Sequence, residues 1–255
     1  MEQKPKKRGQ YLQSVTNALR ILEELGSQKA VGLSDLARRL DLGKSTCYRL
    51  LTTLESRDFV RQHKDTGKYS LGPRTICLAG QFLESNVVYQ AAKPVLKELV
   101  RRTGEAAHVA VLDRDRALFV AKVDSEHPFR MMSHIGWRAP LHCTALGKVL
   151  LAFAKEQALV DSIELVSYTP NTIVNRFKLE MELKRIREQG WAVDEEEAQL
   201  GLRCYAAPVR NFEGEVIASI SASGPKERVT PHNLQLVVEA ARDLSRALGY
   251  PCGEK

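Results

Sequence analysis

The chain has 255 residues, of which 44% are hydrophobic, and it carries a formal net charge of +7. This length suits one large domain or two smaller ones, and no run approaches the roughly 18 apolar residues that would predict a membrane span. An odd number of scattered cysteines without a C-x-x-C pair excludes a disulfide framework and a zinc knuckle, so neither a metal nor a cofactor is predicted; the five are Cys47, Cys77, Cys143, Cys204 and Cys252.

The excess positive charge is concentrated near the N-terminus. Residues 1–73 contain 14 Lys and Arg against 8 Asp and Glu, whereas the rest of the chain contains 24 against 23. The basic start, 1–8, is not followed by an apolar run, so it is not read as a signal peptide and a cytoplasmic location is expected. A basic N-terminal part is suited to neutralising phosphates, which predicts double-stranded DNA as a partner.

Three helices are predicted in the first 54 residues. The first covers about 14–25, where apolar residues recur at helical spacing, with Ser14 as its N-cap. The second covers 33–40, with Ser34 as its N-cap, and a tight turn at 41–43 leads into a third helix at 44–54. This arrangement at about 33–54 is typical of a helix-turn-helix, which places its second helix in a DNA groove.

The third helix and the hairpin after it carry the side chains expected to contact DNA. Hydroxyl groups near a helix N-terminus suit phosphates and bases, and Arg49 suits a bidentate contact to guanine. Strands at 59–63 and 68–71 form a basic wing at about 58–72. Simple solvent exposure is the alternative for these polar residues. The expected DNA-contacting residues are Ser34, Lys44, Ser45, Thr46, Tyr48, Arg49, Thr53, Arg61, Lys64 and Lys68.

A second domain is predicted after a linker helix. Residues 1–73 form the winged helix-turn-helix domain, 74–90 form a helix that acts as a spacer or pairs across a dimer, and 91–255 form the second domain. Strands and helices mix in this last part, which predicts an α+β fold with a mostly antiparallel sheet. Helices are expected at 91–102, 143–154, 175–189 and from Thr230, and strands at 105–111, 116–123, 129–133, 191–194, 205–210 and 215–223.

Three stretches of the chain together resemble the isocitrate lyase regulator (IclR) family of bacterial transcription factors, over nearly the full length. They are Arg49–Leu54 with Tyr69–Gly72, then Pro140–Lys148, and finally Asp194–Glu197 with Gly201–Cys204, Ala206–Val209 and Ser219–Pro225. The resemblance implies a GAF-like C-terminal domain that binds a small effector, often an organic acid. It also implies homodimers that pair through the DNA-binding domain and linker helix, and frequently tetramers. The effector-binding positions that it implies are Ala145, Leu146, Asp194, Cys204, Ser221 and Ser223.

The residues at these positions also make chemical sense. Ser221 and Ser223 are two apart on a strand and share one face, and two inward hydroxyls require a polar partner. Free N–H groups at the start of the 143–154 helix suit a carboxylate. The alternative is that both serines face solvent and that Cys204 is a buried apolar residue.

The sequence therefore predicts a ligand-controlled transcriptional regulator, more often a repressor than an activator, that binds a palindromic operator as a dimer. Two other classes are weaker: a thiol enzyme that uses Cys143 beside His142 or Cys204 with His108, and an architectural DNA-binding protein without a ligand. No catalytic residue is predicted. Three questions stay open. Arg130, Arg138 or Arg203 could contact an anion, and Trp137, Met131 and Met132 form either an apolar lid or part of the core. The sequence does not identify the effector.

Overall fold

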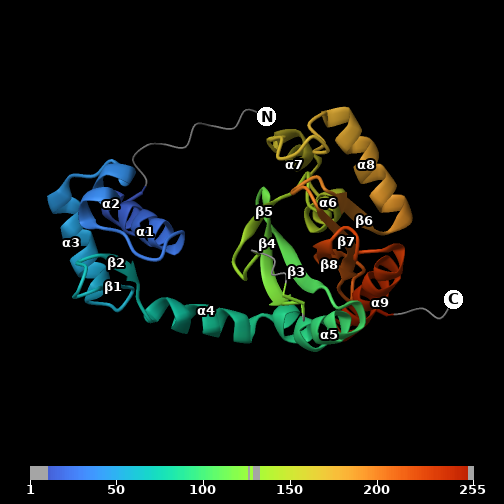
Figure 1. Ribbon diagram of the computed structural model, residues 1–255, viewed down its shortest axis with the longest axis horizontal. Helices are drawn as coiled ribbons and strands as arrows, with labels where there is room; N and C mark the ends of the chain where they lie inside the picture. The colour runs from blue at the N-terminus through green and yellow to red at the C-terminus, as the bar shows by residue number, and fades with distance from the viewer. Residues whose placement is uncertain (1–10, 126, 129–132, 252–255) are drawn as a thin grey trace. The chain divides into compact units, whose positions relative to one another are not determined.

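The computed structural model describes residues 11–125, 127–128 and 133–251. Contacts within the chain define two compact units, Met1–Phe82 and Leu83–Lys255. The predicted α+β class, with an N-terminal helix-turn-helix and a C-terminal domain of sheet and helices, is confirmed (Figure 1). In the described part of the chain, no helix combines the length and apolar character needed to cross a membrane.

The N-terminal unit packs three helices on a short hairpin. Its helices are α1 (Gln13–Gly26), α2 (Leu33–Leu40) and α3 (Lys44–Glu55), and its strands are β1 (Val60–Gln62) and β2 (Tyr69–Leu71), which pair antiparallel. The helices bury one apolar face each, as the 3.6-residue period requires. The core that results contains Ile21, Leu25, Leu36, Leu40, Cys47, Leu51, Val60 and Tyr69.

Two predicted helix caps are wrong. The residues that precede α1 and α2 are Leu12 and Gly32, which have extended backbones and provide no side-chain cap. Ser14 and Ser34 therefore lie inside their helices. The sequence rule fails here because each helix begins one residue before the serine that was predicted to cap it, so the first N–H groups are left without a side-chain acceptor.

The two helices predicted at 74–90 and 91–102 are present, but the boundary between them lies earlier in the chain. Helix α4 (Arg74–Ser85) has no buried residue, and α5 (Val87–Thr103) begins four residues earlier than expected. Asn86 separates them because its side-chain oxygen accepts a hydrogen bond from the Tyr89 N–H at 3.0 Å, as an N-cap does.

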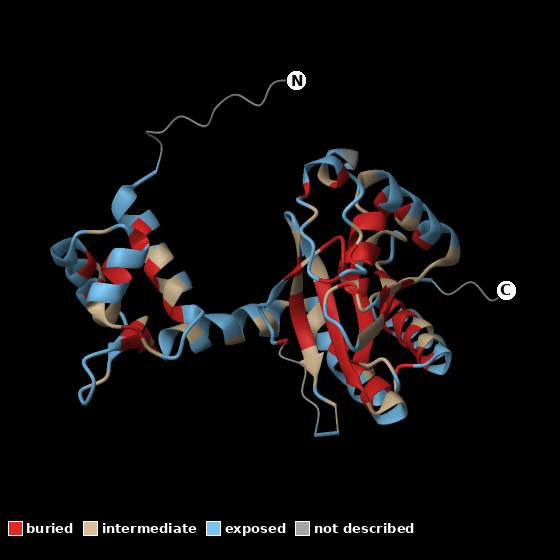
Figure 2. Cartoon of the chain, turned by 45° about the horizontal axis from the view of Figure 1, so that its top comes forward, coloured by how far each residue is buried: buried red, intermediate tan, exposed pale blue. Residues whose placement is uncertain are grey.

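The C-terminal unit is built on a six-stranded antiparallel sheet with helices on both faces. Its strand order is β5-β4-β3-β8-β7-β6. Helices α5 and α9 pack on one face, and α6 and α8 pack on the other (Figures 1 and 2). The bounds are β3 (Ala106–Asp113), β4 (Arg116–Val123), β5 (Arg138–Pro140), α6 (Ala145–Ala152), α7 (Gln157–Ser162), α8 (Arg176–Gln189), β6 (Ala192–Glu195), β7 (Leu202–Arg210), β8 (Val216–Pro225) and α9 (Pro231–Ala247).

Strand β5 and helix α7 were not predicted, because elements of three and six residues give little periodic signal. The strand expected at 129–133 falls largely on residues outside those described, and Ser133 itself is not in a strand. The predicted start of the last helix is confirmed, since the Thr230 N–H donates to Asn233 Oδ1 at 2.8 Å in a capping arrangement.

Strand register places several polar residues on the sheet face that meets α6. Asp194, Cys204 and Ser223 are paired across β6, β7 and β8. One pair further along, Ser221 of β8 is opposite His108 of β3. Because directly opposite residues in a sheet point to the same side, the two rows form one polar patch beneath α6.

Candidate functional site

Helix α3 presents its polar side chains to solvent. Its buried face carries Cys47 and Leu51, and this face fixes which residues point outward. All ten residues predicted to contact DNA are exposed, which are Ser34 on α2, Lys44, Ser45, Thr46, Tyr48, Arg49 and Thr53 on α3, and Arg61, Lys64 and Lys68 on the hairpin. The surface therefore combines exposed hydroxyls, an exposed guanidinium and three basic wing residues on one small unit.

The exposed side chains of α3 occupy two sides of the helix. Thr46, Arg49 and Thr53 line a groove between α1 and α3, together with apolar residues such as Val15 and Leu19. Ser45 and Tyr48 do not line this groove. The difference follows from helical spacing, since residues three and four apart share a side.

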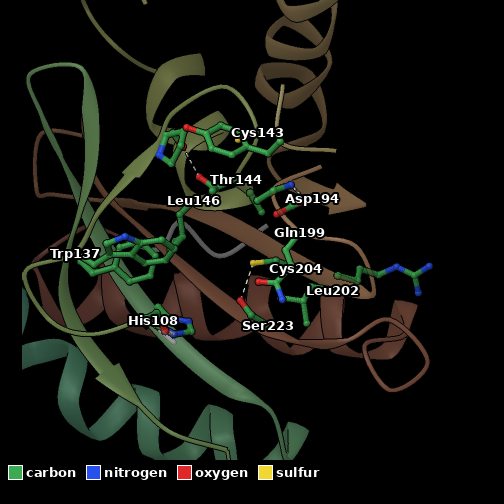
Figure 3. A pocket seen from close by; sticks show the side chains of 17 residues that line it. His108, Trp137, Cys143, Thr144, Leu146, Asp194, Gln199, Leu202, Cys204 and Ser223 are labelled. Atoms are coloured by element: carbon green, nitrogen blue, oxygen red, sulfur yellow. Dashed lines mark hydrogen bonds between the residues drawn. The ribbon is translucent and has the colours of Figure 1, made fainter. Parts of the chain in front are cut away.

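A cavity of about 200 Å³ lies in the C-terminal unit between the polar sheet face and the start of α6 (Figure 3). This volume is below the roughly 300–1,000 Å³ of a site for a drug-sized molecule, so the cavity suits a small metabolite. Five of the six predicted effector positions line it, namely Ala145, Leu146, Asp194, Cys204 and Ser223. Ser221 is fully buried beside them but does not reach the wall.

The N-terminus of α6 forms one end of the cavity. Thr144 is its N-cap, and its hydroxyl oxygen accepts from the Gly147 N–H at 3.1 Å. The Ala145 and Leu146 N–H groups have no acceptor among the described residues. A Cβ on Gly147 would lie 2.6 Å from Pro140 O, so only glycine lets the helix approach the chain this closely. Exposed N–H groups and the helix dipole make this end suitable for an anion.

Asp194 provides a carboxyl group at the side of the cavity. Its Oδ1 accepts from the Glu197 N–H at 2.7 Å and from the Ala198 N–H at 3.3 Å. Burial, reinforced by the neighbouring Glu197 carboxylate, raises the pKa of Asp194 to about 7. Near neutral pH this carboxyl group can therefore serve as either a donor or an acceptor.

The Asp194 carboxyl is expected to make stability depend on pH. Its pKa in the folded protein is about 7, above its ordinary value of 3.8. Its contribution is therefore complete below about pH 4 and is lost as the pH rises through about 7. We expect the unfolding free energy of wild type minus that of Asp194→Asn to be more positive at about pH 5 than at about pH 8, because only wild type loses stability as the pH rises through about 7. Urea unfolding followed by tryptophan fluorescence would measure it, and a pH-independent difference would contradict the assignment.

Helix α6 contains a buried lysine, Lys148, that does not line the cavity and that sequence reasoning missed. Lys148 is 1% exposed and forms an ion pair with Glu197 and a second, at 3.4 Å, with Glu182 of α8. Glu197 belongs to the turn that bonds Asp194, so Lys148 joins α6 to that wall of the cavity. The only sequence signal is a lysine within an otherwise apolar helix, Ala145–Ala152.

The two cysteines of the thiol alternative are poor nucleophiles. Burial raises the pKa of Cys143 and of Cys204 to about 12. Neither has the predicted histidine as a partner, since His142 Nε2 bonds Val166 O, His108 Nε2 bonds Ser133 Oγ, and the Cys204 sulfur accepts from Ser223 Oγ at 2.9 Å. No group of three or more metal-ligating side chains is found among the described residues.

Alkylation would test the state of these thiols. Cys77 is exposed, whereas Cys143 is buried and the thiol of Cys204 is enclosed. Because the thiolate is the reactive form, we expect iodoacetamide to modify Cys77 of the native protein at least about a hundredfold faster than Cys143 or Cys204. Peptide mapping by mass spectrometry would give the rates, and rapid native labelling of Cys143 or Cys204 would restore the nucleophile hypothesis.

The arginines and apolar residues whose roles the sequence left open differ in where they lie relative to the cavity. Arg203 lines the cavity, but its guanidinium pairs with Glu195 at 2.5 Å. Arg138 pairs with Asp113 and does not line the cavity. Trp137 lines the cavity and lies 5.1 Å from Phe119 between ring centroids, so it contributes to the wall and packs on a neighbour. Arg130, Met131 and Met132 lie outside the described residues.

Comparison with known proteins identifies relatives over both units. The IclR helix-turn-helix domain model matches residues 14–64, and the bacterial transcriptional regulator IclR C-terminal model matches residues 80–250. The chain is 38% identical to the HTH-type transcriptional regulator XynR of Escherichia coli, covering 94% of this chain and 98% of that protein. It is 34% identical to the transcriptional repressor IclR of the same organism, covering 93% and 90%.

A solved structure of similar fold contains a small aromatic acid. It is an IclR homologue from Microbacterium hydrocarbonoxydans complexed with 4-hydroxybenzoate. It is 25% identical to this chain with a TM-score of 0.83, and the match covers 92% of this chain and 98% of that one.

Proposed function

Because this chain belongs to the IclR family of bacterial transcriptional regulators, we propose that its N-terminal unit binds operator DNA under the control of a small acid held in the C-terminal cavity. The general function, a DNA-binding transcriptional regulator and not an enzyme, is the one that the sequence predicted, and the curated relatives carry it. The proposal depends on one observation: the same chain has an exposed α3 and a cavity in which polar side chains lie beside a helix N-terminus.

DNA binding is assigned to the exposed residues of α3 and the wing. In a helix-turn-helix the second helix enters the major groove and its N-terminal part meets base edges. We propose that Ser45, Thr46 and Arg49 contact the bases and that Arg61, Lys64 and Lys68 contact phosphates, with Ser34, Lys44, Tyr48 and Thr53 beside them. Their exposure supports this assignment. Proteins that bind DNA act where the DNA is, so the cytoplasm is the proposed location.

The effector is proposed to be a small carboxylic acid. Its carboxylate would accept hydrogen bonds from Ala145 and Leu146 N–H at the start of α6, near Asp194, Cys204 and Ser223. Arg203 pairs with Glu195, and Lys148 pairs with two carboxylates, so neither offers a free cation to the ligand. The 4-hydroxybenzoate bound to the solved homologue belongs to the same chemical class.

Pairing of two chains is proposed from exposed apolar side chains on α1 and α4. Val15 and Leu19 on α1 are about half exposed, and Ile76, Leu78 and Phe82 on α4 are exposed too. Val15 and Leu19, and likewise Leu78 and Phe82, are four residues apart, so each pair lies on one side of its helix, where exposed apolar side chains suit a contact between protein chains. A homodimer, or a tetramer made from two of them, would present two recognition helices to a palindromic operator.

Control by the effector needs only a difference in affinity between two conformations of the protein. A ligand that binds one conformation better shifts the population toward it, and the operator affinity changes by the same coupling free energy. We propose a repressor released by its effector, because the relatives include named repressors. An activator of the same class is the alternative, and a reporter with the operator overlapping its promoter would separate the two.

The test is a band-shift titration at fixed salt with the upstream region of the chain's own gene and with random DNA of equal length. We expect the upstream region to bind at least about 10³-fold more tightly, and a cognate acid to change that affinity by about 5- to 150-fold. No preference for the upstream region would contradict specific regulation. A preference that no small acid alters would favour the architectural alternative.

A further inference from the structure

One wall of the cavity contains a histidine that the family resemblance does not assign to the effector. His108 of β3 lines the cavity and is 1% exposed. Its Nε2 is hydrogen-bonded to Ser133 Oγ at 2.8 Å, and its ring meets the Phe119 ring edge-on at 5.2 Å between centroids. Two contacts of this kind hold the imidazole in one orientation.

The second ring nitrogen of His108 has nothing to bond. Nδ1 is buried and has no hydrogen-bond partner in the described part of the protein. A buried polar atom left unpaired costs about 1–3 kcal/mol. Because His108 lines the cavity, a ligand bound there is in a position to supply the missing hydrogen bond.

The charge of His108 limits what that ligand group can be. Burial, and the nearby Lys122 ammonium, lower the pKa of His108 to about 3. The groups that face the ring from neighbouring elements are Lys122 on β4, Asp124 after it and Ser133. The imidazole is therefore neutral at physiological pH, and Nδ1 either donates or accepts one hydrogen bond, depending on the tautomer.

His108 lies across the cavity from the start of α6. Figure 3 shows its ring at the end of the cavity opposite Cys143 and Thr144, near Ser223, with Cys204 lying between Ser223 and Thr144. A ligand whose carboxylate meets the Ala145 and Leu146 N–H groups therefore extends toward the histidine. A hydroxyl group suits the far end because it can both donate and accept a hydrogen bond.

We propose that His108 determines effector specificity by binding a hydroxyl group at the end of the acid opposite its carboxylate. This inference rests on the proposed function, because it needs the acid to be held at α6. It names the ligand class as a small hydroxycarboxylic acid and His108 as the residue that separates it from the parent acid.

The experiment compares matched acids by isothermal titration calorimetry on the full-length protein. The probes are unbranched carboxylates of about three to six carbons with and without a terminal hydroxyl, plus benzoate and 4-hydroxybenzoate. We expect at least one hydroxylated probe to bind wild type at least about tenfold more tightly than its parent, since a site built to bond a hydroxyl rejects the analogue that lacks it.

Three variants separate specificity from structure. His108→Phe keeps a ring against Phe119 but removes both nitrogens, so the hydroxyl preference should vanish while parent acids bind within about threefold of wild type. His108→Asn keeps a polar atom two bonds beyond Cβ, at the Nδ1 position, and should retain part of the preference. Ser133→Ala removes only the Nε2 partner and should retain most of it. Thermal melts confirm that each variant is folded.

The outcomes divide cleanly. Equal binding of acids and hydroxy acids to wild type, or a preference that survives His108→Phe, overturns the role of His108 and leaves the effector cavity standing. If Ser133→Ala loses the hydroxyl preference to the same extent as His108→Phe, the preference depends on the local structure around the ring. This result also overturns the proposed role of His108. If no acid binds, the proposed effector class fails together with this inference.

Discussion

Replacing Lys148 by methionine is expected to destabilise the C-terminal unit by about 3–5 kcal/mol, because it leaves a buried carboxylate without its cation. Methionine keeps most of the aliphatic stem, so the loss reports the charge rather than a cavity. Glu197 is buried, one of its carboxylate oxygens has no hydrogen-bond partner among the described residues, and Lys148 is the one cation with which it forms an ion pair there. Glu182 keeps Arg185 as a partner at 2.9 Å.

Urea unfolding followed by tryptophan fluorescence measures this effect in the right unit, since both tryptophans of the chain, Trp137 and Trp191, lie there. The matched control is Lys184→Met on α8, an exposed lysine 4.0 Å from Glu188, which should change stability by less than about 0.5 kcal/mol. The double variant Lys148→Met/Glu197→Gln should recover much of the loss.

The destabilisation should also depend on pH. Burial raises the pKa of Glu197 even with Lys148 present, and removing the cation raises it further. The variant then takes up a proton as the pH falls and loses less stability relative to wild type. Equal destabilisation at about pH 5 and about pH 8 would show that the cost comes from packing and not from the unpaired carboxylate.

Replacing Arg49 by alanine is expected to weaken operator binding by about 1–3 kcal/mol, or roughly 5- to 150-fold, with much less effect on random DNA. The side chain is exposed on α3, and it forms no ion pair within the described residues. Its guanidinium is therefore available for a bidentate contact to guanine. Fluorescence anisotropy with labelled operator and labelled random DNA measures both affinities.

A wing variant gives the contrasting result. Lys68→Ala should weaken operator and random DNA alike and reduce the salt dependence of binding by about 0.9 in log–log slope, as expected for one lost phosphate contact. Arg246→Ala, an exposed arginine on α9, is the neutral control. If Arg49→Ala behaves like Lys68→Ala, the guanidinium contacts the backbone and not a base.

The parts that sequence reasoning predicted are those with a local signal. Helical spacing located α1 to α3, and alternation placed Ser221 and Ser223 on the same face of one strand, where the structure shows both to be buried. The family resemblance supplied the positions at the cavity, and five of those six line it. Local pattern did not locate the break at Asn86, because the apolar stripe continues on both sides of it.

What the sequence did not show depends on contacts between distant residues. The sequence shows Lys148 as a lysine within an apolar helix, but its partners Glu182 and Glu197 come from α8 and the turn after β6. His108 alternates with apolar residues in a strand, and only the pairing of β3 with β8 places it opposite Ser221 beside the cavity. Periodicity indicates which face a residue occupies, but it does not say what lies on the other side.

The cavity wall described above brings together segments from His108 to Ser223 that are distant along the chain. A bound acid would therefore contact several of these segments at once and stabilise the folded C-terminal unit. At a free acid concentration of a hundred times the dissociation constant, binding would add about 2.7 kcal/mol to the free energy of unfolding. Cellular proteases degrade the unfolded population. The abundance of this regulator should then rise and fall with the concentration of its effector. This change in protein level would be slower than the change in operator binding that the same effector causes.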